Sequence, residues 1–204
     1  LFLLKDKLEI LINERALRYG EGEHPKHKLM KYHDYFINNI PNDSSVLDIG
    51  CGYGIVARSI AEKVKGVVVT GIDNDRDRLN QAKSNNYFKN LSFIFGDILE
   101  TKKNKKYDVL VMSNILEHVE KRVDFIKKIV QSVLPEIILI RVPLFERHWE
   151  LPMRKELGVN YFSDSTHFIE HTKEEFKKEI SDAGLRIDNM QILWGEIWAK
   201  CITK

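Results

Sequence analysis

The residues with the clearest chemical signature lie in a glycine-rich segment, residues 46–54, which reads Val-Leu-Asp-Ile-Gly-Cys-Gly-Tyr-Gly. An apolar strand, a glycine turn and a following helix leave backbone N–H groups open to a polar ligand, because glycine places no side chain in the way. A dinucleotide-binding turn has glycine at the last position of G-x-G-x-x-G, where this chain has Ile55. The chain has G-x-G-x-G instead, with Asp48 two residues before Gly50. The segment therefore predicts a polar-ligand site that differs from a dinucleotide site.

Two acidic residues, Asp73 and Asp97, stand at the ends of the next two expected strands. In dinucleotide folds an acidic residue about 20 residues after the glycines accepts hydrogen bonds from ribose hydroxyls. Asp73 has an alternative role as the cap of a helix that begins near Asp75, and Asp97 has one as a turn residue. A fourth segment, residues 113–119, follows the next strand and reads Ser-Asn-Ile-Leu-Glu-His-Val. All four features lie at carboxyl ends of strands, where open α/β sheets bind ligands.

Together these segments resemble the motifs of class I S-adenosylmethionine-dependent methyltransferases, of the type 11/12 kind. The resemblance rests on the glycine segment, on Gly71-Ile72-Asp73, on Phe95-Gly96-Asp97-Ile98 and on residues 113–119. It extends from about Tyr32 through most of the chain. It implies that S-adenosylmethionine is the cofactor.

The resemblance also assigns a part of the cofactor to each motif. It implies that the glycine turn passes beside the methionine part, that Asp73 binds the ribose and that Asp97 contacts the adenine amino group. Ile98 is expected against the adenine ring, and the Asn114 region beside the transferable methyl group. The cofactor-binding residues that the resemblance implies are Asp48, Gly50, Cys51, Gly52, Gly54, Asp73, Asn74, Asp97, Ile98 and Asn114.

The residues argue against several other methyl-transfer chemistries. Enzymes that methylate the adenine amino group have Asn-Pro-Pro-Tyr or a close variant after the fourth strand, and residues 113–116 do not fit that pattern. Cytosine C5 chemistry needs a Pro-Cys pair, and neither Cys51 nor Cys201 follows a proline. Two distant cysteines cannot supply the closely spaced trio of a radical enzyme, and Cys51 is expected to be a small buried side chain rather than a nucleophile. No metal site is expected.

An insertion after the fifth strand, residues 143–172, is expected to face the methyl acceptor. It mixes cations with aromatic residues at Arg147-His148-Trp149 and around Arg154 and Tyr161, and Arg141 precedes it. Such a mixture suits a small anionic or sugar-like acceptor. The alternative is a solvated lid with structural aromatic residues.

Three histidines are candidates for a general base, namely His167, His171 and, third, His118. An imidazole with a pKa of about 6.5 can take a proton from an oxygen or nitrogen acceptor at neutral pH. His118 has the alternative role of orienting its loop. Methyl transfer otherwise requires the protein to hold donor and acceptor in line.

These features predict methyl transfer from S-adenosylmethionine to a small-molecule acceptor by in-line displacement, with oxygen expected as the acceptor atom rather than nitrogen. One alternative is a cofactor-binding pseudo-enzyme that serves as a partner-binding module. Another is a methyltransferase with an RNA or protein acceptor. The sequence does not determine the oligomeric state.

The fold class follows from short apolar strands that alternate with helices. Strands are expected over residues 46–49, 67–72, 91–95, 107–112 and 136–142, and helices over residues 3–19, 26–40, 55–65, 76–84, 123–133 and 172–184. Strands without alternating polarity are buried on both faces. With a closing antiparallel pair over 185–194 and 197–202, the sequence predicts an α/β fold: a doubly wound, Rossmann-like, mostly parallel seven-stranded sheet with an antiparallel C-terminal strand pair.

The whole chain, residues 1–204, is expected to form a single methyltransferase domain. Its expected parts are an N-terminal helical cap over 1–45, a cofactor-binding core over 46–142, a substrate-side insertion over 143–172, and a C-terminal helix and strand pair over 173–204.

Composition limits the remaining possibilities. The chain has 204 residues, 43% of them hydrophobic, and a formal net charge of +2, which argues against nucleic acid as a partner and against intrinsic disorder. The basic segments 24–33 and 102–106 are expected to be solvated faces. No apolar run approaches the roughly 20 residues that cross a bilayer, and charges among the first seven residues predict no signal-peptide core. A cytoplasmic location without membrane association is expected.

Overall fold

The computed structural model describes residues 1–21, 24–100 and 106–203. The chain forms two compact units, Leu1–Tyr35 and Phe36–Lys204. The first unit is thus shorter than the helical cap that the sequence predicts over residues 1–45. Most of the basic segment 102–106 lies outside the described residues. Within the ranges that are described, no helix has the length and apolar character needed to cross a membrane.

The N-terminal helices differ from the prediction at one point. Helix α1 (Phe2–Tyr19) ends at Gly20 as predicted. The single helix expected over residues 26–40 is two short helices, α2 (Lys26–Leu29) and α3 (Asp34–Asn39). Lys31 separates them with a left-handed backbone, φ +48°. Because a residue in this conformation ends an α-helix, the chain cannot continue as one helix across Lys31.

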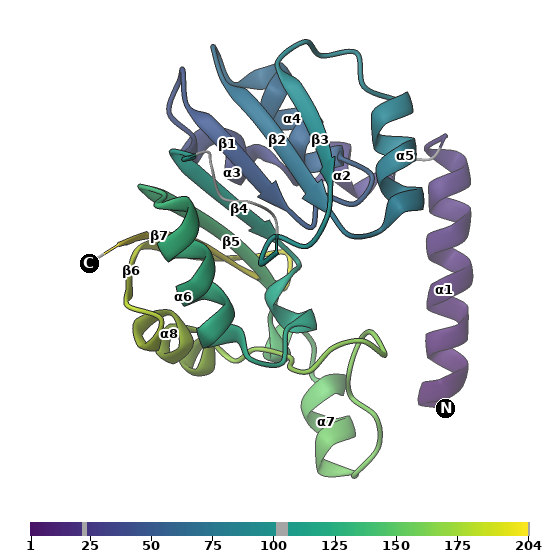
Figure 1. The fold of residues 1–204 in the computed structure, drawn as a ribbon. Helices are drawn as coiled ribbons and strands as arrows, with labels where there is room; N and C mark the ends of the chain where they lie inside the picture. The colour runs from purple at the N-terminus through teal and green to yellow at the C-terminus, as the bar shows by residue number, and fades with distance from the viewer. Residues whose placement is uncertain (22–23, 101–105, 204) are drawn as a thin grey trace. The chain divides into compact units, whose positions relative to one another are not determined.

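The second unit is built on a seven-stranded sheet with the strand order β3-β2-β1-β4-β5-β7-β6 (Figure 1). The strands are β1 (Ser45–Ile49), β2 (Val68–Asp73), β3 (Leu91–Phe95), β4 (Val109–Ser113), β5 (Ile137–Pro143), β6 (Leu185–Leu193) and β7 (Glu196–Thr203). The first five pair in parallel, and β7 pairs antiparallel with both β5 and β6. This confirms the predicted fold class.

Helices cover both faces of the sheet, with α6 and α8 on one face and α4 on the other (Figure 1). The helices of this unit are α4 (Ile55–Lys63), α5 (Arg76–Ser84), α6 (Arg122–Val133), α7 (Glu150–Glu156) and α8 (Lys173–Asp182), with two short 3-10 helices, η1 (Leu116–His118) and η2 (Phe145–Arg147). The boundaries expected for the longer helices and the strands of this unit differ from those observed by no more than two residues at any end, which is the usual uncertainty.

Side chains along β1 alternate between the two faces. Leu47 and Ile49 belong to a buried cluster with Ile126 and Ile129 of α6 and with Phe176 of α8. The other side chains of the strand, Asp48 among them, therefore point to the face that α4 covers. A carboxyl group is in this way buried directly before the glycine turn.

Strand order fixes where a ligand site can lie. Strand β1 pairs with β2 on one side and with β4 on the other. The chain therefore changes direction across the sheet at β1, and open α/β sheets bind ligands at such a switch point, beyond the carboxyl ends of the strands. The glycine turn follows β1, Asn114 follows β4, and Asp73 is the last residue of β2.

The insertion after β5 contains two short helices that are not among the helices expected from the sequence. Helices η2 and α7 lie within it. Its two ends are joined by a parallel bridge between Leu144 and His171, and the Phe145 N–H donates to the His171 carbonyl at 2.8 Å. The insertion is thus a closed loop with a fixed base.

Helix α8 begins with a capping box formed by Thr172 and Glu175. The Glu175 N–H donates to Thr172 Oγ1 at 3.1 Å, and the Thr172 N–H donates to Glu175 Oε2 at 3.0 Å. These bonds satisfy two amide donors that would otherwise lack partners at the helix start.

We expect Thr172→Ala to lower the free energy of unfolding by about 1 kcal/mol, because it removes the side-chain cap. Urea unfolding followed by circular dichroism measures this change. Thr203→Ala, an exposed threonine at the end of β7, is the matched control. If both variants unfold at the same urea concentration, the capping box contributes nothing to stability.

Candidate active site

The glycine turn after β1 has three residues with left-handed backbones: φ is +63° at Gly50, +52° at Gly52 and +72° at Gly54. A Cβ atom at Gly54 would lie 2.5 Å from Cζ of Phe93, and one at Gly50 would lie 2.1 Å from Cδ1 of Ile115. A Cβ at Gly52 would have no heavy atom of the described structure within 4 Å. The turn is therefore packed at both ends and open in the middle, where a ligand can approach the backbone.

Asp73 connects the glycine turn to the end of β2. Its Oδ2 accepts from the Gly52 N–H and its Oδ1 from the Asp75 N–H, both at 2.7 Å. The cap of α5 is Asp75, which accepts from the N–H groups of Asp77 and Arg78. The alternative in which Asp73 caps this helix is thus wrong. Each carboxylate oxygen of Asp73 has a further lone pair for a ligand donor.

Asp48 is a buried acid beside this turn, with 1% of its surface exposed. Its Oδ2 atom has no hydrogen-bond partner among the described residues. Burial, reinforced by the nearby charge of Asp73, raises the pKa of Asp48 to about 7. A buried acceptor without a partner fits a bound group that carries positive charge or a donor, so the observed site suits the cofactor that the resemblance implies.

The predicted adenine residues follow β3. Asp97 is exposed, and its Oδ1 accepts from the Leu99 N–H at 2.8 Å. This contact is the one expected if Asp97 is a turn residue, the alternative to a role in adenine binding. The Gly96 N–H donates to the Asp73 carbonyl at 3.0 Å, so the ends of β2 and β3 are held together. Ile98 packs partly buried against the core, and Asn74 is exposed.

Asn114 follows β4 with a left-handed backbone, φ +56°. Its N–H donates to the Arg141 carbonyl at 2.9 Å, and its Oδ1 accepts from Arg141 Nε at 3.1 Å. Arg141 is buried, lies 3.9 Å from a carboxylate oxygen of Glu196 and stands over the ring of Trp198. The sequence places Arg141 on the acceptor side, whereas in the structure its side chain holds Asn114.

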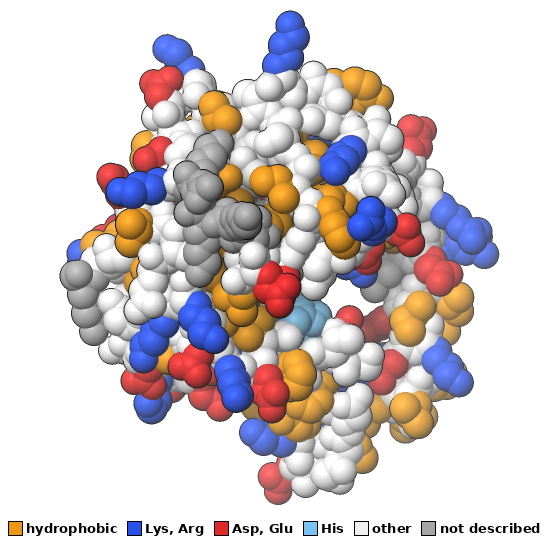
Figure 2. All heavy atoms as spheres, in the orientation of Figure 1, with side chains coloured by type: hydrophobic (Ala, Val, Ile, Leu, Met, Phe, Trp, Pro, Cys, Tyr) orange, Lys and Arg blue, Asp and Glu red, His pale blue; other side chains and the backbone are white. Residues whose placement is uncertain are grey.

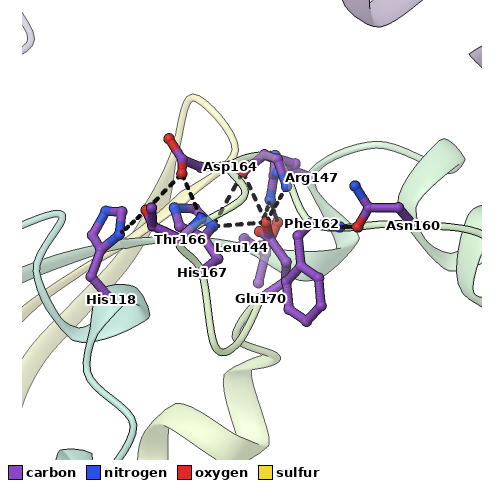
Figure 3. A network of polar contacts seen from close by, with 10 residues as sticks. His118, Leu144, Arg147, Asn160, Phe162, Asp164, Thr166, His167 and Glu170 are labelled. Carbon is purple, nitrogen blue, oxygen red and sulfur yellow. Dashed lines mark hydrogen bonds and ion pairs between the residues drawn. The ribbon is translucent and has the colours of Figure 1, made fainter. Parts of the chain in front are cut away.

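Two of the three predicted histidines lie together. The rings of His118 and His167 are 4.7 Å apart between centroids and meet edge to face. His118 Nδ1 lies 2.8 Å from Thr166 Oγ1, which itself donates to Asp164 Oδ1 at 2.6 Å (Figure 3). The hydroxyl proton of Thr166 is therefore directed to Asp164, so Thr166 accepts from His118 and the Nδ1 atom of His118 carries the proton.

His167 is oriented by a buried carboxylate. Its Nδ1 lies 3.0 Å from Glu170 Oε1, and Glu170 also accepts from Arg147 and from Ser163 (Figure 3). Burial raises the pKa of Glu170, but the hydrogen bonds from His167, Arg147 and Ser163 outweigh it and lower that pKa to about 2. Glu170 is thus an ionised acceptor, so the His167 Nδ1 atom donates to it. Both histidines therefore leave Nε2 without a hydrogen bond among the described residues.

The charges around the pair shift the two histidine pKa values in opposite directions. Burial lowers the pKa of His167, but the hydrogen bond and charge of Glu170 outweigh it and raise that pKa. Burial, together with the neighbouring His167, lowers the pKa of His118. His167 is therefore the better proton acceptor of the two.

The third predicted histidine, His171, is fully buried and does not join this pair. Its Nε2 lies 3.0 Å from Glu179 Oε2, and Glu179 forms an ion pair with Arg122 at 2.8 Å. Its ring packs edge-on against Phe176. These contacts join the insertion to α8 and α6, and favour a structural role over the predicted role as a base.

Glu117 is a residue of this site that the sequence motifs do not single out. It is 1% exposed, and neither carboxylate oxygen has a hydrogen-bond partner in the part of the chain that the structure describes. Burial raises the pKa of Glu117 to about 7. Its carbonyl accepts from the Phe168 N–H at 2.8 Å, so its segment is tied to the insertion. The only signal in the sequence was its place next to His118.

Two cationic side chains of the insertion contact other residues of the same insertion. Arg147 pairs with Glu170, and Lys155 lies over the rings of Phe145 and Tyr161 at 5.2 and 5.5 Å. These contacts match the alternative of structural aromatic residues for this part of the insertion.

Trp149 is exposed. Figure 2 shows one face of the molecule, on which a histidine side chain is exposed between acidic and hydrophobic side chains.

The chain is similar to known proteins in both sequence and fold. A family model described as a methyltransferase domain matches residues 40–197. The chain is 33% identical over 94 residues to a probable (S)-tetrahydroprotoberberine N-methyltransferase 2 of Papaver bracteatum, and the aligned segment covers 44% of this chain and 26% of the relative. It is 36% identical over 117 residues to a ubiquinone biosynthesis O-methyltransferase of Rickettsia canadensis, and the aligned segment covers 52% of this chain and 48% of the relative. The chain therefore spans about half or less of the length of these relatives.

A solved structure extends the likeness to nearly the whole chain. Magnesium protoporphyrin IX methyltransferase from Synechocystis PCC 6803, with bound S-adenosylhomocysteine, superposes with a TM-score of 0.67 at 18% identity and covers 93% of this chain and 86% of that one. The family model spans most of the chain and includes all seven strands in whole or in part. The chain belongs to the methyltransferase domain family, and it shares the fold of that solved methyltransferase.

Proposed function

We propose that this protein transfers the methyl group of S-adenosylmethionine to an oxygen atom of a small-molecule acceptor. The observation that carries the proposal is the pair of histidines His118 and His167, whose rings are in contact. Their Nδ1 atoms are bonded to Thr166 and Glu170, and their Nε2 atoms have no hydrogen bond in the described chain. His118 lies four residues after Asn114. A hydroxyl acceptor must lose a proton when it is methylated, so oriented imidazoles suit it. The relative named as an O-methyltransferase supports oxygen, and the one named as an N-methyltransferase makes nitrogen the second candidate.

The cofactor side of the proposal uses residues at the ends of β1 to β4. The open backbone at Gly52 and the carboxylate of Asp73 would hold the methionine and ribose parts, and Asp97, Ile98 and Asn74 the adenosine part. Gly50, Cys51 and Gly54 shape the turn. When bound, S-adenosylmethionine supplies an electrophilic methyl group on a sulfonium centre, which the acceptor displaces in line. The unpartnered Oδ2 of Asp48 would face the positive charge of that ligand.

On the acceptor side, the simplest role belongs to His167. Its Nε2 atom accepts the proton of the acceptor hydroxyl, and Glu170 stabilises the imidazolium that results. Arg141 keeps the Asn114 side chain in place beside the methyl group. The small acceptor itself is expected to be anionic or sugar-like, since Trp149 and His148 are exposed on the insertion.

A panel of acceptors tests the proposal directly. We expect formation of S-adenosylhomocysteine that depends on a hydroxylated small molecule, with the new methyl group found on oxygen by mass spectrometry and NMR. Methylation of amines alone would replace oxygen by nitrogen. Cofactor binding without turnover of any acceptor, RNA and protein included, would favour the partner-binding alternative.

We expect Asp73→Ala to weaken S-adenosylmethionine binding by about 10- to 150-fold, because charge-assisted hydrogen bonds contribute about 1.5–3 kcal/mol. Isothermal titration calorimetry measures the affinity. Asp77→Ala removes the same charge from an exposed position of α5 and should bind normally. Unchanged affinity in a folded Asp73→Ala protein would mean that the ribose assignment is wrong.

We expect His167→Gln to lower kcat by roughly 10²- to 10⁴-fold, the usual contribution of general acid–base catalysis, and to leave cofactor affinity unchanged. Glu146→Gln, on the exposed part of the same insertion, is the control. Full activity of His167→Gln with the best acceptor would exclude His167 from the reaction.

A further inference from the structure

Glu117, His118 and His167 form a group, called here the Glu117 cluster, with the composition of a metal site. Each residue offers one ligand atom, and these atoms lie within 4.8 Å of one another. Two come from η1 and the third from the insertion, so the cluster joins the strand-end segment to the acceptor side.

The first reason to assign a ligand here is the state of Glu117. Its carboxylate is almost completely buried, and neither oxygen accepts a hydrogen bond from any described residue. Burying a carboxylate without a partner costs several kcal/mol, and native proteins rarely leave one in this state. A cation between the carboxylate and the two imidazoles would supply the missing partner.

The second reason is the orientation of the two histidines. Histidines that bind metals commonly donate their other ring N–H to a carboxylate or a similar acceptor, which fixes the tautomer and the ring. His167 donates its Nδ1 proton directly to Glu170. His118 donates through the Thr166 hydroxyl, which in turn donates to Asp164 (Figure 3). Both Nε2 lone pairs are therefore available, without a competing hydrogen bond in the described structure.

We propose that Glu117, His118 and His167 bind a divalent cation at the acceptor side of the active site. Two imidazole nitrogens and one carboxylate suit cations of the Mn²⁺, Fe²⁺, Co²⁺ and Zn²⁺ group rather than Ca²⁺, which prefers oxygen ligands alone. Three protein ligands leave coordination positions open, as in catalytic sites. His118 is exposed, so these positions can be reached from solvent.

The role of this cation rests on the proposed function. A hydroxyl bound to such a cation loses its proton more readily, and the proton passes to water. The acceptor oxygen then forms its bond to the methyl carbon as the sulfur–carbon bond breaks, so no redox partner is needed. The cation would thereby replace direct proton transfer to His167.

Cation binding is tested without turnover. The whole 204-residue chain, freed of metal with a chelator, is titrated with CoCl₂ and followed by visible absorption, and with ZnCl₂ by calorimetry. We expect one site with the ligand-field bands of nitrogen and oxygen coordination. Glu117→Gln, His118→Gln and His167→Gln should each weaken binding by at least about tenfold. His148→Gln and Glu146→Gln, two neighbours on the insertion outside the cluster, should bind as the wild type does.

Two results would overturn the assignment: no Co²⁺ binding at millimolar concentration, or equal binding by the wild type and the three cluster variants. If Glu117→Gln fails to fold, His118→Gln decides the test, because His118 is exposed and its replacement leaves the core unchanged. Turnover that is insensitive to chelator in a cation-binding protein would overturn the catalytic role alone. Cation binding without turnover of any acceptor would support the site and contradict the proposed function.

Discussion

The hydrogen bond from the Gly52 N–H to Asp73 Oδ2, at 2.7 Å, is the contact on which the cofactor side of the site depends. It joins the turn after β1 to the end of β2 across 21 positions of sequence. A charge-assisted bond of this kind is stronger than a neutral one. It holds a turn of three left-handed glycines in one conformation, with the middle glycine open. The ends of β3 and β4 supply the remaining residues of the cofactor side.

A second carboxylate organises the acceptor side in a similar way. Glu170 is buried and ionised, and it gathers Arg147, Ser163 and His167 within one loop. The part of the insertion between α7 and α8 has no helix or strand, and the base of the insertion is closed by the bridge between Leu144 and His171. The direction of the His167 ring is thus set by Glu170 rather than by a helix or strand.

The sheet could be predicted from the sequence because its determinants are local: apolar runs of strand length and glycines in the turn. Features that depend on distant contacts could not be predicted. Lys31 interrupts a helical pattern through a left-handed backbone that a lysine does not indicate. His171 and His167 have the same residue type and the same loop, yet one is fully buried against Glu179 and the other faces His118. Glu117 was not selected, because the absence of partners around a carboxylate becomes visible only in three dimensions.

The acids of the site fall into two kinds, and the difference indicates where ligands belong. Asp73 and Glu170 accept hydrogen bonds from the protein and build the site. Asp48 and Glu117 are buried, and one carboxylate oxygen of Asp48 and both of Glu117 have no partner among the described residues. Burial raises the pKa of each to about 7. One precedes the glycine turn and the other follows β4, so they stand on the two sides proposed for the methyl donor and for the acceptor. A positively charged ligand at each would offset the cost of burying these acids, and would stabilise the folded protein by binding to it alone.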